Sequence, residues 1–141
     1  MYLDSVYKSY IISKLINILV NKSTKYTIEI KILYLIKYIK FKFKTINPIF
    51  FIYESIEILK PTLGLHKIRF YKNRRILINF TTYKLKSISS YNLSIKWFKL
   101  GVLSSIKLNL YTKIFIELLN ILIFNQGISI QKKLQHYKYI T

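Results

Sequence analysis

Isoleucine and leucine recur along most of this chain at the three- and four-residue spacing of an α-helix, and lysine or glutamate interrupts every apolar run. This pattern predicts amphipathic helices that bury one face against each other. A membrane-spanning helix needs roughly 18 consecutive apolar residues, and no run here approaches that length. The sequence therefore predicts a mainly α-helical bundle without a membrane span.

Residues that commonly begin or end helices divide this pattern into segments. Thr45 and Asn47 precede Pro48, which is the usual order of a cap and a first helical turn, and Pro61 ends the same helix. The expected helices lie at 4–21, about 24–43, about 48–59, about 90–101 and about 107–124, and the tail at 127–141 begins a sixth helix or lies along a surface.

Some local features leave alternatives open. The candidate first residues or caps of the second and fourth helices are Ser23 or Thr24, and Ser90 or Asn92. The KFKFK stretch at 40–44 alternates like a strand, but the longer apolar period favours a helix. Gly101 indicates either a loose helix end or a close helix crossing. Tyr53 and Leu100 are expected to face inward, and Trp97 is expected in the core.

The stretch 63–81 departs from the helical pattern. Two β-branched and aromatic runs, Lys67–Tyr71 and Ile76–Phe80, flank four polar or cationic residues, Lys72, Asn73, Arg74 and Arg75. This order predicts a β-hairpin with a charged tip. All three arginines of the chain lie in it: Arg69, Arg74 and Arg75. Arginine can grip a phosphate with two hydrogen bonds, so a hairpin between the third and fourth helices that reaches into nucleic acid is expected.

Charge and composition point to an anionic partner. The chain has 24 lysines and arginines against five acidic residues, a formal charge of +19, within 141 residues that we expect to form one domain. Self-repulsion of this size opposes folding unless a polyanion lies beside the protein. Nucleic acid is the first candidate and an anionic membrane is the second. A content of 52% hydrophobic residues excludes a disordered basic tail.

The chain carries few residues suited to catalysis or metal binding. It has no cysteine, and its two histidines, His66 and His136, lie far apart in sequence. Glu54 and Glu57 lie three residues apart on a helix, where pairing with nearby lysines is the expected role. Without a nucleophile, a metal cluster or a glycine-rich phosphate loop, we expect neither an enzyme nor a cofactor.

Four stretches resemble one known family in their order and approximate spacing: KLINILVNKSTKYTIE at 14–29, SIEILKP at 55–61, NLSIKWF at 92–98, and IEL at 116–118 with NQGISIQKK at 125–133. They are similar to the universal small-subunit ribosomal protein seven family of bacteria and organelles. Glu57, Pro61 and Trp97 match the family's patterns, whereas Lys96 replaces an arginine.

The chain also departs from this family. Most of the family's basic N-terminal extension is missing, and Ser23 replaces a glycine in the first basic turn. The hairpin lacks the family's Arg-Arg-x-Gly-Gly turn, about four extra residues precede the fourth helix, and the last helix is shortened. RNA contacts of those pieces are therefore expected to be lost or supplied by other proteins.

The resemblance implies a structural constituent of an organellar ribosome that binds the 3′ major domain of small-subunit rRNA. Such a protein organises the head of the subunit beside other head proteins, and its hairpin lies near the exit-site tRNA and the mRNA exit path. The abundance of Ile, Lys, Tyr, Phe and Asn suits an AT-rich organelle gene. We therefore expect the mitochondrial matrix, with the plastid as the alternative.

The candidate RNA-binding residues lie on several predicted elements. They are Lys14, Lys22 and Lys25 around the first interhelical turn; Lys67, Arg69, Lys72, Arg74 and Arg75 in the hairpin; Lys84 and Lys86 in a following linker; Lys96 in the fourth helix; and Lys132 and Lys133 facing outward in the tail. Lys37, Lys40 and Lys44 share a helix face and suit rRNA or solvent equally. A peripheral membrane protein would instead gather its cations on one helix face beside exposed apolar residues.

Overall fold

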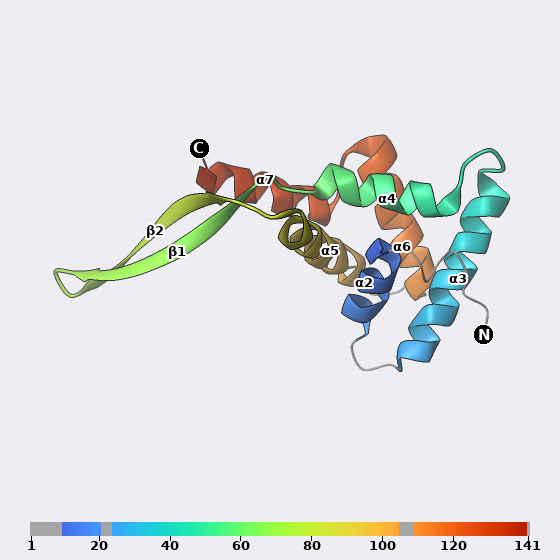
Figure 1. The fold of residues 1–141 in the computed structure, drawn as a ribbon, viewed down its shortest axis with the longest axis horizontal. Coiled ribbons are helices and arrows are strands. Elements are labelled where there is room, and N and C mark those ends of the chain that lie inside the picture. The colour runs from blue at the N-terminus through green and yellow to red at the C-terminus, as the bar shows by residue number, and fades with distance from the viewer. Residues whose placement is uncertain (1–9, 21–23, 105–108, 141) are drawn as a thin grey trace.

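A computed structural model describes residues 10–20, 24–104 and 109–140. Within these ranges the elements follow in the order α2 (Tyr10–Leu19), α3 (Lys25–Lys42), α4 (Pro48–Leu59), β1 (Leu63–Lys72), β2 (Arg75–Lys84), α5 (Ser87–Leu103), α6 (Leu110–Leu119), η1 (Asn120–Phe124) and α7 (Ile128–Ile140). The predicted fold class is confirmed: the chain is mainly α-helical, with one hairpin after the third described helix. We call the helices together the helical body; the hairpin projects from it (Figure 1).

The apolar period of each helix faces a common core. In α3 the buried side chains are Ile28, Ile32, Leu35 and Ile39, which recur at three- and four-residue spacing. Equivalent stripes from α2, α4, α5 and α6 complete one cluster, and Ile130 adds α7 to it. The helical prediction for the alternating stretch at 40–44 is confirmed as far as Lys42.

The start of α4 shows how local signals place a helix. The Asn47 side chain accepts a hydrogen bond from the backbone N–H of Ile49 at 3.1 Å, and Pro48 occupies the first helical turn. The helix ends at Leu59, just before Lys60 and Pro61. Both predicted boundaries are therefore confirmed. Thr24 precedes α3, whereas Ser23, the alternative cap, lies outside the described residues.

Gly101 marks a close helix crossing, which decides between its two predicted roles. A Cβ at this position would overlap the Glu117 carboxylate of α6 and the Ser129 hydroxyl of α7. Glu117 is buried and accepts hydrogen bonds from the Ser129 hydroxyl and from the Ser129 backbone N–H, the latter at 3.4 Å. The carboxylate lies at the N-terminal turn of α7, where the helix dipole favours negative charge.

The chain turns sharply between α6 and α7. Helix α6 widens into η1, Asn125 then adopts φ 50°, and the Gln126 N–H donates to the Asn120 carbonyl oxygen at 3.0 Å. Gly127 follows with φ 111°, a conformation that favours glycine. The predicted stop is confirmed, and the tail forms helix α7, which is one of its two predicted alternatives.

Three boundary and burial predictions are wrong. The fourth helix begins at Ser87, so Ser90 lies inside it, buried, with its hydroxyl donating to the Pro61 carbonyl oxygen. Tyr53 and Leu100 are exposed, because the apolar stripes of α4 and α5 are narrower than their apolar composition suggests. Trp97 is only 8% exposed, which confirms its place in the core.

No single helix in the described part of the chain is both long and apolar enough to cross a membrane. The segment Leu110–Phe124 together with Ile128–Ile140 reaches the required length and composition, but the two parts are bent by 56°.

Candidate nucleic-acid interface

The hairpin is longer and its turn tighter than the sequence indicated. Strands β1 and β2 pair antiparallel from Leu63 opposite Lys84 to Lys72 opposite Arg75. The connection is therefore the dipeptide Asn73–Arg74, not the four residues predicted, and Lys84 ends β2 and does not lie in a linker. Cross-strand pairing continues to the tip because backbone N–H and C=O groups form the hydrogen bonds of the ladder. Charged side chains therefore do not interrupt it.

Both turn residues adopt left-handed backbone conformations, with φ 50° at Asn73 and 63° at Arg74. A two-residue turn with two positive φ angles matches the right-handed twist of the flanking strands. Asparagine enters this region readily, whereas arginine does so rarely. Arg74 therefore adopts its turn conformation at some conformational cost. Its side chain is exposed at the end of the hairpin.

Cations lie on both faces of the ribbon. Residues directly opposite in an antiparallel pair share a face, so the register assigns Lys67 and Arg69 to one face and Lys72 and Arg75 to the other. Apolar partners accompany each set: Tyr71, Ile76, Ile78 and Phe80 on the first face, and Ile68, Phe70 and Leu77 on the second. From Tyr71 to Lys84 every residue is exposed.

The tip carries a shallow hollow of about 420 Å³ lined by Lys72, Asn73, Arg75 and Leu77. Its two cationic side chains, with the amide of Asn73, supply several hydrogen-bond donors within a short length of chain. A phosphate or a nucleotide edge supplies the matching acceptors. The tip is therefore chemically suited to an anion.

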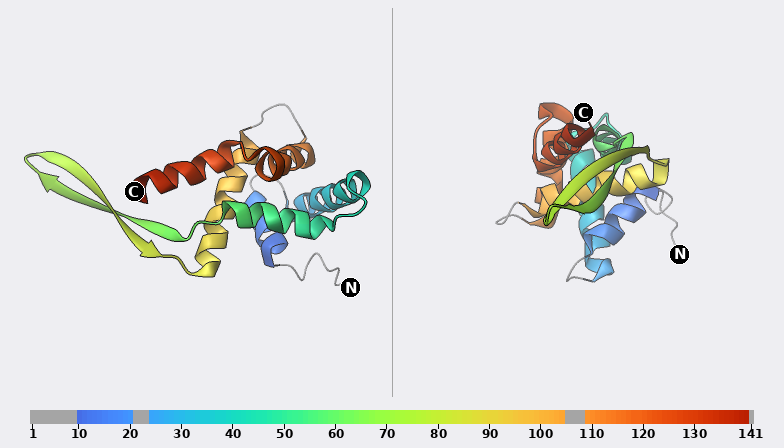
Figure 2. Two further views of the ribbon diagram at one scale, coloured as in Figure 1. Left: turned by 90° about the horizontal axis from the view of Figure 1, so that it is seen from above. Right: turned by 90° about the vertical axis from the view of Figure 1, so that its left-hand side faces the viewer.

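Helix α7 holds the base of the hairpin. The His136 Nε2–H donates to the Leu63 carbonyl oxygen at 2.6 Å, and the Tyr139 ring lies 4.6 Å from the Phe80 ring, centre to centre. His136 also contacts Trp97 edge-on at 5.3 Å, which links the base of the hairpin to α5. Figure 2 shows the C-terminal end of α7 beside the ribbon. An isolated two-stranded hairpin is marginally stable, so these contacts set its angle to the helical body.

Gly64 brings the two strands together at the base. A Cβ there would overlap the ring of Tyr83, the residue opposite it in the register. The Tyr83 ring lies 4.5 Å from that of His66, centre to centre. This aromatic pair stiffens the hairpin on the side of the ribbon that carries Lys72 and Arg75.

The remaining predicted RNA-binding residues are dispersed. The exposed ones are Lys25 at the first residue of α3, Lys86 just before α5, Lys96 on α5 and Lys132 on α7. Lys14 on α2 is half-buried, and Lys22 lies outside the described residues. Lys37, Lys40 and Lys44 are all exposed, although Lys44 follows the end of α3. The hairpin thus gathers six predicted residues, and the others lie on separate helices.

Lys133 does not face outward as predicted. Its ammonium group donates to the carbonyl oxygen of Ile58 in the last turn of α4, and burial lowers the pKa of Lys133. A cation is favourable at a helix C-terminus, where free carbonyl groups carry partial negative charge. Lys133 therefore joins α7 to α4, and the adjacent Lys132 alone remains exposed.

The carboxylate of Glu57 is occupied by a structural network. It accepts a hydrogen bond from the Tyr91 hydroxyl, and its other oxygen lies 3.9 Å from the Lys60 ammonium nitrogen. Burial by itself would raise the pKa of Glu57, but hydrogen bonds from Tyr91 and Tyr53 and the charge of Lys60 outweigh it and hold the pKa below its ordinary value. The hydrogen bond to Glu57 in turn raises the pKa of Tyr91. The expected pairing with lysine is confirmed for Glu57.

Among the described residues no three His, Asp or Glu side chains come together in a way that would hold a metal ion. His66 stacks on a tyrosine, and His136 is hydrogen-bonded at the base of the hairpin. The tethering roles of His136 and Tyr139 were missed by sequence reasoning, because no local pattern shows that residues this far along the chain return to β1 and β2.

The hairpin, with its cations on two faces and its helical brace, is thus the strongest candidate for an interface with nucleic acid. A scan against protein-family models found none that matches this chain, and a search of curated proteins found no match. The geometry and charge of the chain itself are therefore what indicate its function.

Proposed function

We propose that this chain is an RNA-binding structural protein of an organellar small ribosomal subunit, a divergent member of the protein seven family. The observation that carries the proposal is the hairpin, which holds all three arginines of the chain on an exposed ribbon braced by α7. The resemblance of the stretches on either side of the hairpin to this family also supports the proposal.

The mechanism is electrostatic and geometric. Lysines and arginines that neutralise phosphates release condensed counterions, which supplies most of the affinity and makes it depend on salt. Contacts to the phosphate backbone fix the position and angle of a protein on RNA. Because α7 sets the angle of the hairpin, cations on the helical body and on the hairpin would engage RNA in a defined relative orientation.

The alternative is a basic protein on an anionic membrane. A membrane surface is planar and meets one side of a molecule, whereas Lys67 and Arg69 lie on the opposite face of the ribbon from Lys72 and Arg75. RNA can surround a protruding ribbon and contact both faces. The arrangement of the cations therefore favours RNA.

The proposed partner is the 3′ major domain of small-subunit rRNA, with neighbouring head proteins and, at the hairpin, the exit-site tRNA and mRNA exit path. The proposed location is the mitochondrial ribosome, with the plastid ribosome as the alternative. This assignment of compartment rests on the codon-related bias toward Ile, Lys, Tyr, Phe and Asn.

The test is binding of the full chain to a transcript of the organellar 3′ major domain across a range of salt concentrations. We expect Arg74→Ala combined with Arg75→Ala to weaken binding and to flatten the salt dependence by about one unit of slope per lost phosphate contact. The matched control, Lys40→Ala combined with Lys44→Ala, removes the same charge from exposed positions at the other end of the molecule. Unchanged affinity and slope in the arginine variant would contradict a role for the hairpin.

A further inference from the structure

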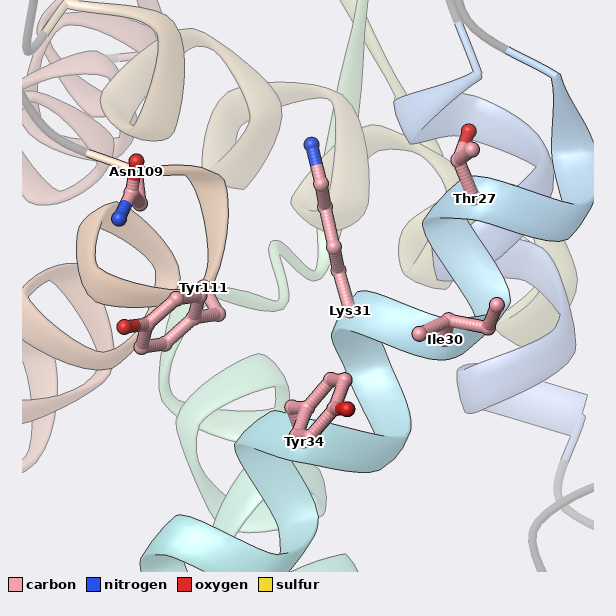
Figure 3. A pocket seen from close by; sticks show the side chains of 6 residues that line it. All are labelled: Thr27, Ile30, Lys31, Tyr34, Asn109 and Tyr111. Atoms are coloured by element: carbon pink, nitrogen blue, oxygen red, sulfur yellow. The ribbon is translucent and has the colours of Figure 1, made fainter.

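A hollow between α3 and α6 lies away from the hairpin, and no sequence pattern indicated it. It has a volume of about 320 Å³ and is lined by Thr27, Ile30, Lys31 and Tyr34 of α3, and by Asn109 and Tyr111 at the start of α6 (Figure 3). A second hollow of about 180 Å³ adjoins it, because Ile30 and Tyr34 line both and Lys37 extends the lining along α3.

The shape of the hollow follows from the contact between the two helices. Tyr38 of α3 and Phe115 of α6 meet edge-on, with 4.9 Å between ring centres. Tyr34 and Tyr111 each lie one helical turn before these residues, and there the helices leave a space. The residues on α3 that line it recur on one flank of the helix, beside the buried stripe.

The lining of the two hollows combines aromatic rings and apolar side chains with lysines. Tyr34 is 62% exposed and Tyr111 is 36% exposed, so both rings remain available to a partner. Ile30 adds an apolar surface, and the remaining surface of the hollow is almost wholly apolar, although Thr27 and Asn109 also line it. Lys31 and Lys37 supply two ammonium groups, and no carboxylate among the described residues lines either hollow.

We propose that this hollow binds one unpaired nucleotide of RNA, with its base against the tyrosines and its phosphate on Lys31. Unstacked bases in single-stranded RNA are held by aromatic side chains and by hydrogen bonds to their edges. A nucleotide offers a planar base and an anion in one unit, which matches this lining. A second copy of this chain would bring another +19 charges to the same place and is disfavoured.

The site would give the protein a second point of attachment. Helix α3 lies at the end of the helical body away from the hairpin (Figures 1 and 2). A nucleotide bound there lies far from RNA that is bound at the hairpin tip. The two contacts together therefore fix the direction of the RNA across the protein. This inference rests on the proposed RNA-binding function and adds a separate site to it.

The experiment measures binding of the full chain to a short single-stranded RNA and to an abasic RNA of equal length. We expect Tyr34→Ala to weaken binding of the normal RNA about tenfold and to leave binding of the abasic RNA unchanged. Tyr34→Phe keeps the ring and should restore affinity. Tyr26→Ala is the matched control, because Tyr26 is 69% exposed on the same helix and lines neither hollow.

Three outcomes overturn the site. The first is unchanged binding of the normal RNA by the Tyr34→Ala variant, and the second is an equal loss of affinity for the normal and the abasic RNA. The third is that Tyr34→Ala releases a neighbouring protein from isolated subunits while nucleotide binding stays intact. Each of these is compatible with rRNA binding that still responds to the hairpin arginines, in which case the proposed function stands. Failure of the unaltered chain to bind either short RNA or the 3′ major domain would instead remove the proposed function itself.

Discussion

The helical body and the hairpin use apolar residues in opposite ways. In the helical body, isoleucines and leucines at helical spacing are withdrawn from water and form one cluster. In the hairpin, residues such as Ile76, Ile78 and Tyr71 remain exposed on a two-stranded ribbon, and within the described part of the chain no second layer covers it. The helical body is thus stabilised by its own packing, whereas the hairpin depends on α7 at its base and, in the proposed function, on RNA along its length.

The largest expected effect separates these two regions directly. Leu35 on α3 is fully buried, and Leu35→Ala should lower the free energy of unfolding by about 3 kcal/mol through lost burial and a residual cavity. Urea denaturation monitored by helical circular dichroism measures this change. The comparison variant Ile78→Ala, on the exposed ribbon, should change the stability by less than about 0.5 kcal/mol. Similar losses in the two variants would show that the hairpin packs more tightly than its exposure indicates.

The second effect tests the crossing of α5 with α6 and α7. Gly101→Ala should destabilise the protein by about 2 kcal/mol, because the added methyl group overlaps Glu117 and Ser129 in a closely packed interior. Thermal unfolding measures the change, with Ser89→Ala at an exposed position of α5 as the control. A Gly101→Ala protein as stable as the unaltered one would mean that α7 can move away from α5 without cost.

The third effect lies where the two regions meet. Tyr139→Ala removes the ring contact with Phe80 and should reduce global stability by about 1 kcal/mol or less. Hydrogen exchange should quicken at the base of β1 and β2 while the helices stay protected. Because the hairpin then loses its fixed angle, affinity for the 3′ major domain should also fall. Unaltered exchange in the strands would show that the hydrogen bond from His136 is a sufficient brace.

The smallest effect concerns acid stability of the helical body. The pKa of Glu57 is lowered in the folded protein, so its contribution to stability is present above the pKa of the unfolded chain and is lost as pH falls through the lower folded value. Tyr91→Phe removes the hydroxyl that donates to this carboxylate. The variant should therefore lose less stability than the unaltered protein between pH about 5 and pH about 3, as measured by urea midpoints. Parallel pH profiles would exclude Glu57 as a source of acid sensitivity.

Most of the helical body was predictable because its signals are local. The spacing of Ile28, Ile32, Leu35 and Ile39 defines one buried face of α3 without reference to any other segment. Asn47 before Pro48 marks a helix start for reasons of backbone hydrogen bonding alone. Exposure was harder to predict: Tyr53 and Leu100 are apolar enough for the core but lie just outside the stripe that neighbouring helices cover.

The candidate site was predictable in place but not in detail. Arginine content marked the hairpin, whereas its register, its two-residue turn and the division of its cations between two faces follow from strand pairing. Lys132 and Lys133 are adjacent and chemically identical in sequence. Only the position of α4 makes one of them a half-buried donor to Ile58 and leaves the other exposed.

The sequence by itself determined the type and order of the elements, the position of the hairpin and the excess of positive charge, since periodicity, capping and charge are properties of neighbouring residues. The tertiary structure decided which residues far apart in the chain meet. His136 reaches the carbonyl oxygen of Leu63, and Tyr34 and Tyr111 line one hollow. Such contacts depend on how helices cross and pack, which no local pattern specifies.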